Sequence, residues 1–530
     1  MLYLHLSKSI YFNMLKTKLA LIVGLLSLTS YGQDNPKLNE TYRVSKPFPT
    51  SNASIIPLDG KILLSNSSKK EYQYSLATGN NYNITKSNSG AQTPIGKTEK
   101  HFGNAQIGSK YYKFIYDLDK KTGAFEIFTY EINTENLAIS KDKKSVIKAT
   151  NAKLDKELKA SIMYINISAA TLNIWTMPSQ DKSKLHILYY NEDNETSRQL
   201  QVITIDENLE VLNNRSYKLN PTNKKDETFD KFKVGYDGNI YNLRHVRFME
   251  NKTRYSRLQL EILNPEEGAV TLPIEIKKGD MKSCSIHASP EANIIVAGTY
   301  LDGTENGMFA MDCMEGEFGE ISYLPIPLDL IKKYKSEKQV EGIESNIAKN
   351  KNVLPFLQIS HAGATADGSI ILTAEIQYEI RKTDSRGNVS ITYVLEEAFT
   401  GAMDKDGNEL WINKIPKRSA SAYGADTFFD DNETHQIIIY LDDYRNEKLE
   451  ENQNPHTMQS NLPGMVVAYT IDKKTGEMER HALFNMKDVD GKEVYNFIKN
   501  KLYKTGKNEY TIKLYYKNKE DVFVTSIVPM

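Results

Sequence analysis

The chain has 530 residues, with 67 Lys and Arg against 68 Asp and Glu, so its formal net charge at pH 7 is -1. This balance excludes the basic excess that is typical of a dedicated nucleic-acid-binding protein. Hydrophobic residues make up 40% of the chain, which suffices for a large core, and the 32 tyrosines favour strands, because aromatic side chains suit half-buried sheets.

The N-terminal segment has the parts of a secretory signal peptide. Met14–Lys18 is short and basic, Leu19–Leu28 is apolar, and Ser30–Gly32 supplies small residues at the cleavage site. We therefore expect residues 1–32 to be a signal peptide that directs the chain to the periplasm or the cell surface. The alternative is a membrane anchor, for which the apolar run is short, and there is no Cys near the cleavage point to carry a lipid.

One unit recurs through the rest of the chain: a polar turn, a strongly apolar strand, an aromatic residue near its end and a polar loop. Its eight copies are Asp59–Leu64, Gly108–Tyr116, Lys184–Tyr190, Asp237–Tyr241, Asn293–Tyr300, Asp367–Glu375, His435–Tyr440 and Asn508–Tyr515. Units that recur at such intervals are typical of stacked or radial repeat proteins.

The sixth copy shows the most complete unit. Strands over Phe356–Ile359, Ser369–Tyr378, Val389–Met403 and Glu409–Ile415 follow one another with short loops between them, which predicts one antiparallel four-stranded sheet. Runs such as Ile437–Ile439 are apolar on both strand faces, as in a propeller blade that lies between two others. We therefore predict an all-β fold, with residues 33–530 forming a single β-propeller domain of eight, alternatively seven, four-stranded blades.

The last copy ends at Val522–Val528 and lacks an outer strand. Thr41–Val44 is expected to supply this strand and so to close the ring. Apolar residues recur at helical spacing in Ile147–Tyr164 and in Leu328–Val353, which predicts short helical insertions there. We expect these helices to pack on the propeller; the alternative is that they dock a partner.

No motif in the sequence identifies a catalytic, metal or cofactor site. Gly96–Thr98 resembles a phosphate-binding loop, but Ala91 stands where the pattern needs a glycine. The acidic turns Asp404–Asn408 and Asp488–Gly491 do not continue into a calcium-binding loop, and they favour ordinary hairpin turns. The histidines have no zinc-binding spacing, and a nucleophile elbow is absent. We expect no metal and no cofactor, and an enzyme is neither supported nor excluded.

The loops after the second strands are expected to share one side of the ring, and most are acidic and begin with Tyr. The candidate binding residues are Tyr116, Asp117, Tyr190, Asp193, Tyr300, Asp302, Tyr440, Asp442, Asp443 and Tyr444. The alternative is ordinary hairpins whose tyrosines pack on the strand ends. The fourth unit differs, because its loop carries Arg244, His245 and Arg247.

The two cysteines, Cys284 and Cys313, are expected on non-neighbouring strands of one sheet. Export would permit a disulfide between them but does not require one, and we favour two buried thiols.

From Asn293 onward the chain resembles a family of uncharacterised exported propeller-like proteins of flavobacteria and their relatives. The resemblance is carried by Val296–Tyr300, Asp367–Glu375, Asp406–Trp411 and Ile415–Arg418. It implies export and β-rich repeats but no activity. Ala402–Trp411 is also similar to one quinoprotein-type repeat, but Trp does not recur there in the other units, which argues against a quinone cofactor.

These features together predict a non-catalytic exported propeller that binds a protein or a glycan, or acts as a scaffold, in the cell envelope. The alternative is a propeller-fold polysaccharide hydrolase or lyase that uses carboxylates from several loops. The expected partner is an envelope protein or a glycan, and not a nucleic acid.

Overall fold

The computed structural model describes residues 42–530, apart from 50–53, 59, 68–71, 80–81, 88–98, 120–123, 141, 150–153, 156–170, 173, 192–198, 220–226, 251–252, 265–267, 315–316, 422–426, 460–461, 496–501 and 517–519. Thr41–Met530 form one compact unit. The predicted signal peptide, residues 1–32, lies outside the described residues. Within them, none of the helices has both the length and the apolar character needed to cross a membrane.

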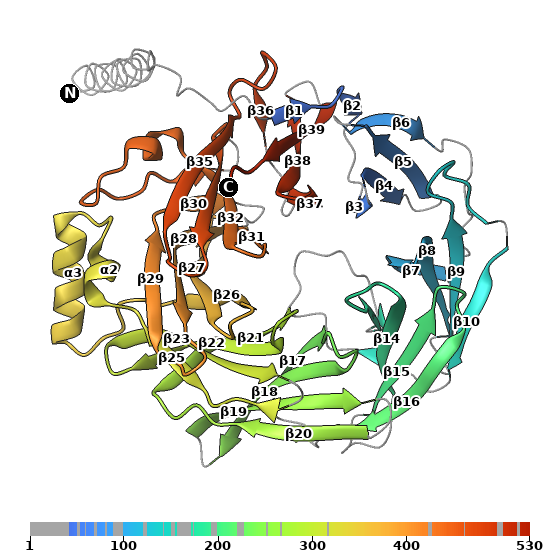
Figure 1. Cartoon of the computed structure of the whole chain (residues 1–530), viewed down its shortest axis with the longest axis horizontal. Helices are drawn as coiled ribbons and strands as arrows, with labels where there is room; N and C mark the ends of the chain where they lie inside the picture. Colours follow the sequence, from blue (N-terminus) through green and yellow to red (C-terminus); the bar gives the residue numbers. More distant parts are fainter. Residues whose placement is uncertain are drawn as a thin grey trace, which may run out of the picture. The chain divides into compact units, whose positions relative to one another are not determined.

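Eight sheets of the described chain, antiparallel apart from one short parallel pair in blade 6, follow one another around a ring and form an eight-bladed β-propeller (Figure 1). The prediction of eight blades is therefore confirmed, against the alternative of seven. In blades 1 to 7 the first strand lies nearest the middle of the ring, and in blade 8 the inner strand that pairs with β38 is β37 (Leu502–Gly506).

The strands of the blades have the following bounds. Blade 1 consists of β3 (Ser54–Leu58), β4 (Lys61–Ser67), β5 (Tyr72–Thr78) and β6 (Asn83–Ser87), and blade 2 of β7 (Glu99–Ile107), β8 (Lys110–Leu118), β9 (Phe125–Ile132) and β10 (Lys144–Ala149). Blade 3 consists of β13 (Ile174–Pro178), β14 (Lys184–Asn191), β15 (Gln199–Asp206) and β16 (Val211–Lys218), and blade 4 of β17 (Glu227–Val234), β18 (Ile240–Glu250), β19 (Thr253–Asn264) and β20 (Gly268–Ile274). Blade 5 consists of β21 (Asp280–Ser289), β22 (Asn293–Asp302), β23 (Glu305–Met314), β24 (Glu317–Phe318) and β25 (Ser322–Pro325). Blade 6 consists of β26 (Leu357–Ala364), β27 (Ile370–Thr383), β28 (Val389–Met403), β29 (Glu409–Ile415), β30 (Ser419–Ser421) and β33 (Met458–Gln459). Blade 7 consists of β31 (Phe428–Asp431), β32 (His435–Asp442), β34 (Met465–Asp472) and β35 (Met478–Asn485), and blade 8 of β36 (Val494–Tyr495), β37 (Leu502–Gly506), β38 (Glu509–Tyr516), β39 (Glu520–Ile527), β1 (Tyr42–Val44) and β2 (Phe48–Pro49).

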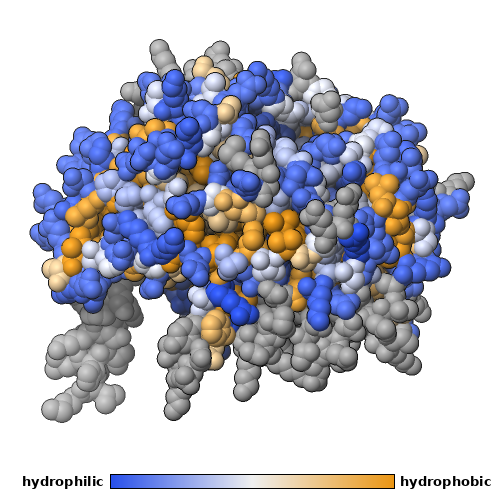
Figure 2. All heavy atoms as spheres, turned by 60° about the horizontal axis from the view of Figure 1, so that its bottom comes forward, coloured by the Kyte–Doolittle hydropathy of each residue, from blue (hydrophilic) through white to orange (hydrophobic). Residues whose placement is uncertain are grey.

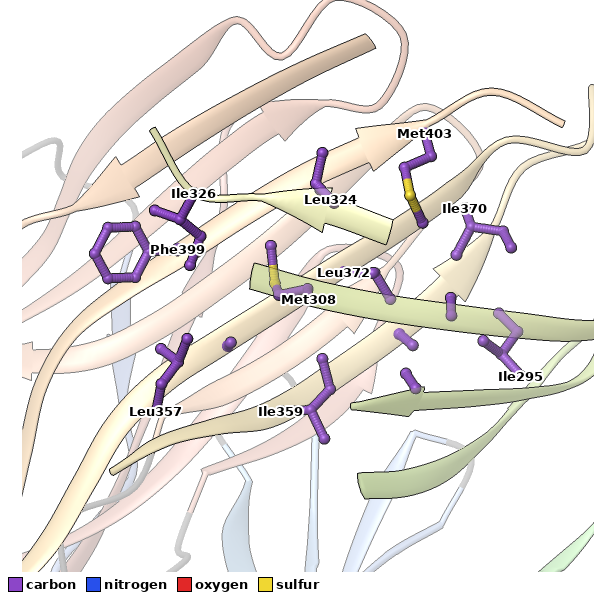
Figure 3. Packing of buried hydrophobic residues seen from close by; sticks show 14 of the residues in the cluster. Ile295, Met308, Leu324, Ile326, Leu357, Ile359, Ile370, Leu372, Phe399 and Met403 are labelled. Atoms are coloured by element: carbon purple, nitrogen blue, oxygen red, sulfur yellow. The ribbon is translucent and has the colours of Figure 1, made fainter. Parts of the chain in front are cut away.

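The eight apolar runs of the sequence are the second strands of the eight blades. In β32, Ile437 and Ile439 pack in the cluster shared with blade 8, whereas Ile438 packs in the cluster shared with blade 6. Each second strand therefore has its two faces covered by the two neighbouring blades, which explains why the strand is apolar on both sides. Figure 3 shows one such cluster, in which Ile295 and Met308 of blade 5 meet Leu372 and other residues of blade 6.

The ring closes through a strand from the N-terminal part of the chain. Tyr42 of β1 is opposite Ser526 of β39 in an antiparallel ladder, and Val44 is opposite Val524. The predicted closure by Thr41–Val44 is thereby confirmed for Tyr42–Val44.

One of the two predicted helical insertions is present and the other is not seen. Leu328–Val353 contains α2 (Leu328–Lys332) and α3 (Glu337–Ala348), which lie on the outer side of blade 6 in Figure 1. Within Ile147–Tyr164, however, the described residues are strand, because Ile147 belongs to β10 and β11 (Leu154–Asp155) pairs with β12 (Thr171–Leu172). The helix prediction is wrong for these residues, and the rest of that range lies outside the described residues.

The two cysteines lie on non-neighbouring strands of blade 5, as expected. Cys284 of β21 is opposite Gly298 of β22, which in turn is opposite Phe309 of β23, whereas Cys313 lies four residues further along β23. The strand spacing and rise place the two Cα atoms roughly 16 Å apart, which is too far for a disulfide. Cys284 is a free, buried thiol.

Candidate functional site

Three of the predicted binding tyrosines are buried. The Tyr116 ring packs between blades 2 and 3, and the Tyr300 hydroxyl donates a hydrogen bond to Glu305 at 2.7 Å. The Tyr440 ring stacks on Tyr469, with ring centroids 6.2 Å apart and planes 6° apart. These tyrosines therefore pack on the strand ends, which was the alternative interpretation of the pattern.

The predicted aspartates of blade 7 stabilise their own loop. Asp442 is buried and accepts hydrogen bonds from the Asn446 amide at 2.7 Å and from the Arg480 guanidinium at 3.1 Å. Burial raises the pKa of Asp442, although the amide and the guanidinium oppose this. Asp443 accepts a hydrogen bond from the Arg445 backbone N–H at 3.0 Å and so caps the short 3₁₀ helix η1 (Tyr444–Lys448).

The other predicted residues are dispersed over the ring. The Tyr190 hydroxyl donates to Asp230 of blade 4 at 2.7 Å, Asp117 is half-buried in blade 2, and Asp302 is exposed in blade 5. Tyr444 is half-buried, with the Lys487 ammonium 4.3 Å from its ring centroid, whereas Asp193 lies outside the described residues. The structure therefore brings together only the four residues of blade 7, and a binding role for the ten residues stays a prediction.

A different aromatic residue is exposed on the same side of the ring. Apolar side chains form separate patches among hydrophilic ones on the face that Figure 2 displays. Phe356 is one of the exposed large apolar residues, with 60% of its surface accessible. It directly precedes β26, the innermost strand of blade 6, at the side of the ring where the second strands end.

Phe356 also has an unfavourable backbone conformation. Its φ is 71°, in the left-handed region, which few bulky residues adopt. Tyr82, Leu137 and Leu209 share a positive φ, but all three side chains are buried, so packing compensates for the strain. The Phe356 ring is mostly in solvent, and such strain at an exposed position is a mark of functional sites.

Polar side chains surround the partner ring of Phe356. Its centroid is 5.5 Å from that of Tyr378, whose hydroxyl donates to Glu396 at 2.9 Å, and the Arg418 guanidinium is 3.3 Å from the same carboxylate. Gln358 follows two residues after Phe356 in β26, is exposed, and donates its amide to the carbonyl of Gln377 at 3.4 Å. We name Phe356, Gln358, Tyr378, Glu396 and Arg418 the Phe356 surface. The sequence indicated a strand beginning at Phe356, but a left-handed phenylalanine has no sequence signal.

A second polar cluster lies on the inner strands of blades 5, 6 and 7. The His361 imidazole is hydrogen-bonded to Asp431 at 2.7 Å, stacks on Phe429 and meets the His287 ring edge-on, with centroids 6.0 Å apart. Burial lowers the pKa of His287 to about 3, so this imidazole is neutral at pH 7. Burial alone would raise the pKa of Asp431, but the His361 ring outweighs this and holds that pKa below its usual value.

Among the described residues, this cluster lacks the nucleophile of a catalytic triad. An aspartate that orients a histidine forms part of a general base, but nucleophilic catalysis also needs a hydroxyl or thiol in contact with it. Among the described residues, neither His287 nor His361 is hydrogen-bonded to a Ser, Thr or Cys side chain. In the same part of the chain, no group of three His, Cys, Asp or Glu side chains is arranged to hold a metal ion. The cluster joins the inner strands of three blades.

The chain is similar to known propellers in fold alone. No protein-family model and no curated protein matches it. Among solved structures it is similar to the Dos1 propeller, with a TM-score of 0.38 and 10% identity over 92% of this chain and 95% of that chain. It is also similar to an α-L-arabinanase of Penicillium chrysogenum, with a TM-score of 0.31 and 11% identity over 69% of this chain and 98% of that chain. It is also similar to a prolyl endopeptidase, with a TM-score of 0.36 and 11% identity over 90% of this chain. The matched part spans 55% of the length of that endopeptidase.

Proposed function

We propose that this protein is a non-catalytic propeller of the cell envelope that binds a glycan through the Phe356 surface. The observation that carries the proposal is the exposed Phe356 ring, held in solvent by a strained backbone at the inner edge of blade 6.

The residues around Phe356 suit a sugar better than a purely apolar ligand. The C–H groups on one face of a pyranose ring pack on an aromatic ring, and its hydroxyls need donors and acceptors beside that ring. Tyr378, Glu396 and Arg418 supply these groups next to Phe356.

No observation favours the alternative, a polysaccharide hydrolase or lyase. A glycoside hydrolase of the usual kind needs two carboxyl groups that face each other across the scissile bond. The inner-strand carboxylates Asp430 and Asp431 are engaged instead, since Asp430 accepts from Tyr510 at 2.6 Å and Asp431 pairs with His361.

The binding proposal is tested by titrating the mature protein with a panel of oligosaccharides in a calorimeter. We expect at least one member of the panel to bind, and Phe356→Ala to weaken it about tenfold, because the stacking platform is lost. Tyr236→Ala is the matched control, since Tyr236 is 47% exposed but lies in the turn between β17 and β18, on the other side of the ring. A protein that binds none of the sugars, or a Phe356→Ala variant that binds as tightly as the wild type, contradicts the proposal.

Export is the second part of the proposal and is supported by the sequence of residues 14–32. When the chain is produced in a bacterium that has a Sec pathway, we expect the mature protein in the periplasmic or secreted fraction, beginning at Gln33. Mass spectrometry of its N-terminal peptide checks this, and an uncleaved cytoplasmic chain would refute it.

A further inference from the structure

A group of basic side chains lies between blade 4 and blade 5. Phe229 and Lys231 of β17 are opposite His245 and Leu243 of β18 in the strand ladder, and Arg247 follows two residues after His245. The Lys231 ammonium donates to the carbonyl of Cys284 in β21 at 2.6 Å, so this sheet face is turned toward blade 5. We name Phe229, Lys231, His245 and Arg247 the basic wedge.

Within the described part of the chain, no carboxylate forms an ion pair with Lys231 or Arg247. The Arg247 guanidinium lies over the Phe229 ring, 4.9 Å from its centroid. Arg247 is opposite Glu227 in the strand ladder, but it forms no ion pair with any described side chain. Arg244 differs, because it points to the other face of the sheet and pairs with Asp230 at 2.7 Å and with Glu261 at 2.9 Å.

The electrostatics of neighbouring groups agree with this description. Burial lowers the pKa of His245, and the charges of Arg247 and Lys231 lower it further. Burial raises the pKa of the Cys284 thiol, and the same two cations oppose that rise. For both groups, the charged neighbours among the described side chains are Arg247 and Lys231, and both are positive.

The Phe229 ring is the part of the basic wedge that is open to a ligand, since it is 46% exposed although it belongs to an innermost strand. Beside it, the Nε2 atom of His245 is buried and has no hydrogen-bond partner among the described residues, which is costly. An aromatic face, a guanidinium and an imidazole thus converge near the point where β17 begins.

We propose that the basic wedge binds the anionic group, a carboxylate or a sulfate ester, of an acidic sugar. This rests on the proposed function, because it takes the ligand to be a glycan that extends from the Phe356 surface. Phe229 and Phe356 both lie at the beginning of an innermost strand, on the same side of the ring, with blade 5 between them. A guanidinium binds a carboxylate or sulfate through two parallel hydrogen bonds, and the Phe229 ring stacks on the sugar that carries it.

The test compares matched pairs of charged and neutral oligosaccharides on the full mature chain. One pair is an oligogalacturonate and its methyl ester, and the other is a κ-carrageenan oligosaccharide and the same oligosaccharide after desulfation. We expect the charged member of at least one pair to bind about tenfold more tightly at low salt, with a difference that shrinks as sodium chloride is added. The pair that shows the difference identifies the anion as carboxylate or sulfate.

The decisive variant is Arg247→Gln. It should remove the preference for the charged member while leaving the affinity for the neutral member unchanged. Arg257→Gln is the matched control, because Arg257 lies in β19 of the same blade, opposite Val246 on the other sheet face, and the net charge changes equally. The control should keep the preference.

The outcomes separate the two proposals. If neutral members bind as tightly as charged ones, or if Arg247→Gln keeps the preference, the basic wedge is not the anion site, while binding that depends on Phe356 still supports the proposed function. If charged members bind through Arg247 and Phe356→Ala has no effect, the basic wedge stands as an anion site and the Phe356 surface is wrong. If no oligosaccharide binds, both proposals are overturned.

Discussion

At Phe356 the backbone strain and the exposed ring can be separated by two substitutions. A left-handed conformation costs a non-glycine residue about 1 kcal/mol, and alanine keeps this cost whereas glycine removes it. We therefore expect Phe356→Gly to be more stable than Phe356→Ala by about 1 kcal/mol in urea denaturation, although both lose the ring and the binding that depends on it. At a residue of ordinary conformation the order is reversed, so a more stable alanine variant would show that the left-handed φ is wrong.

His186 makes the stability of the protein depend on pH. It is 5% exposed, with one ring nitrogen 2.9 Å from the Thr204 hydroxyl, and burial followed by the nearby Lys184 lowers its pKa to about 4. In the unfolded chain the pKa is about 6.5. The contribution is therefore fully present above pH 6.5 and is lost as the pH falls toward 4, because only the unfolded chain takes up the proton in that range.

We expect His186 to account for about 2 kcal/mol of the stability that is lost between pH 7 and pH 5. Denaturant unfolding of His186→Gln at pH 7, 6 and 5 should show a loss that is smaller by this amount. His456→Gln, at an exposed position, is the control. If the wild type and His186→Gln lose the same stability between pH 7 and pH 5, folding does not lower the pKa of His186.

At the scale of elements, Lys414 of β29 holds α2 on blade 6. Its buried ammonium donates to the carbonyls of Ile331 at 2.9 Å and Lys333 at 2.6 Å and lies 3.5 Å from Glu397. Burial lowers the pKa of Lys414 to about 8, although Glu397 opposes this. A cation at the C-terminal end of a helix satisfies carbonyls that have no partner within the helix.

Lys414→Met is expected to destabilise the protein by about 3 kcal/mol, because the carbonyls and part of the Glu397 charge lose their partner. Lys335 still pairs with Glu397 at 2.5 Å, which limits the loss. Relative to the wild type, the variant should exchange its amide hydrogens faster in α2 and α3, with a smaller change in the strands of blade 6. Lys405→Met, in the exposed turn between β28 and β29, should change neither quantity; an effect of equal size there would point to a general loss of charge.

The sequence is sufficient for elements whose pattern is local and insufficient for contacts between elements. Ile437–Ile439 predicts a doubly covered strand because its apolar residues are consecutive. Burial of Tyr300 and Tyr440 depends instead on Tyr323 and Tyr469, which come from other strands. The apolar spacing after Ile147 predicts a helix, but Ile147 is buried between blades 2 and 3 as part of a strand.

For the whole molecule, eight clusters of buried apolar side chains are found in the described residues, one between each pair of consecutive blades. The cluster between blade 8 and blade 1 joins the two ends of the chain, since Phe48 and Phe523 pack there with Ile62. The pairing of β1 with β39 covers the edge of β39 and ties the N-terminal part of the chain to the last blade. The candidate sites depend on this closure, because neighbouring blades hold the inner strands in place.

A chain that begins at Thr50 and so lacks β1 and β2 should test this closure. It loses the ladder to β39, the hydrogen bonds of Ser45 with the Phe523 backbone at 2.9 and 3.0 Å, and the Phe48 ring, whose centroid is 5.0 Å from that of Phe523. We expect its free energy of unfolding to fall by at least about 3 kcal/mol, and the exposed β39 edge to promote association in size-exclusion chromatography. A chain that begins at Thr41 is the control and should behave like the mature protein. Adding a peptide of residues 41–49 should raise the melting temperature of the shorter chain, because a strand supplied in trans can pair with the open edge. If the shorter chain melts like the control, β1 does not close the ring.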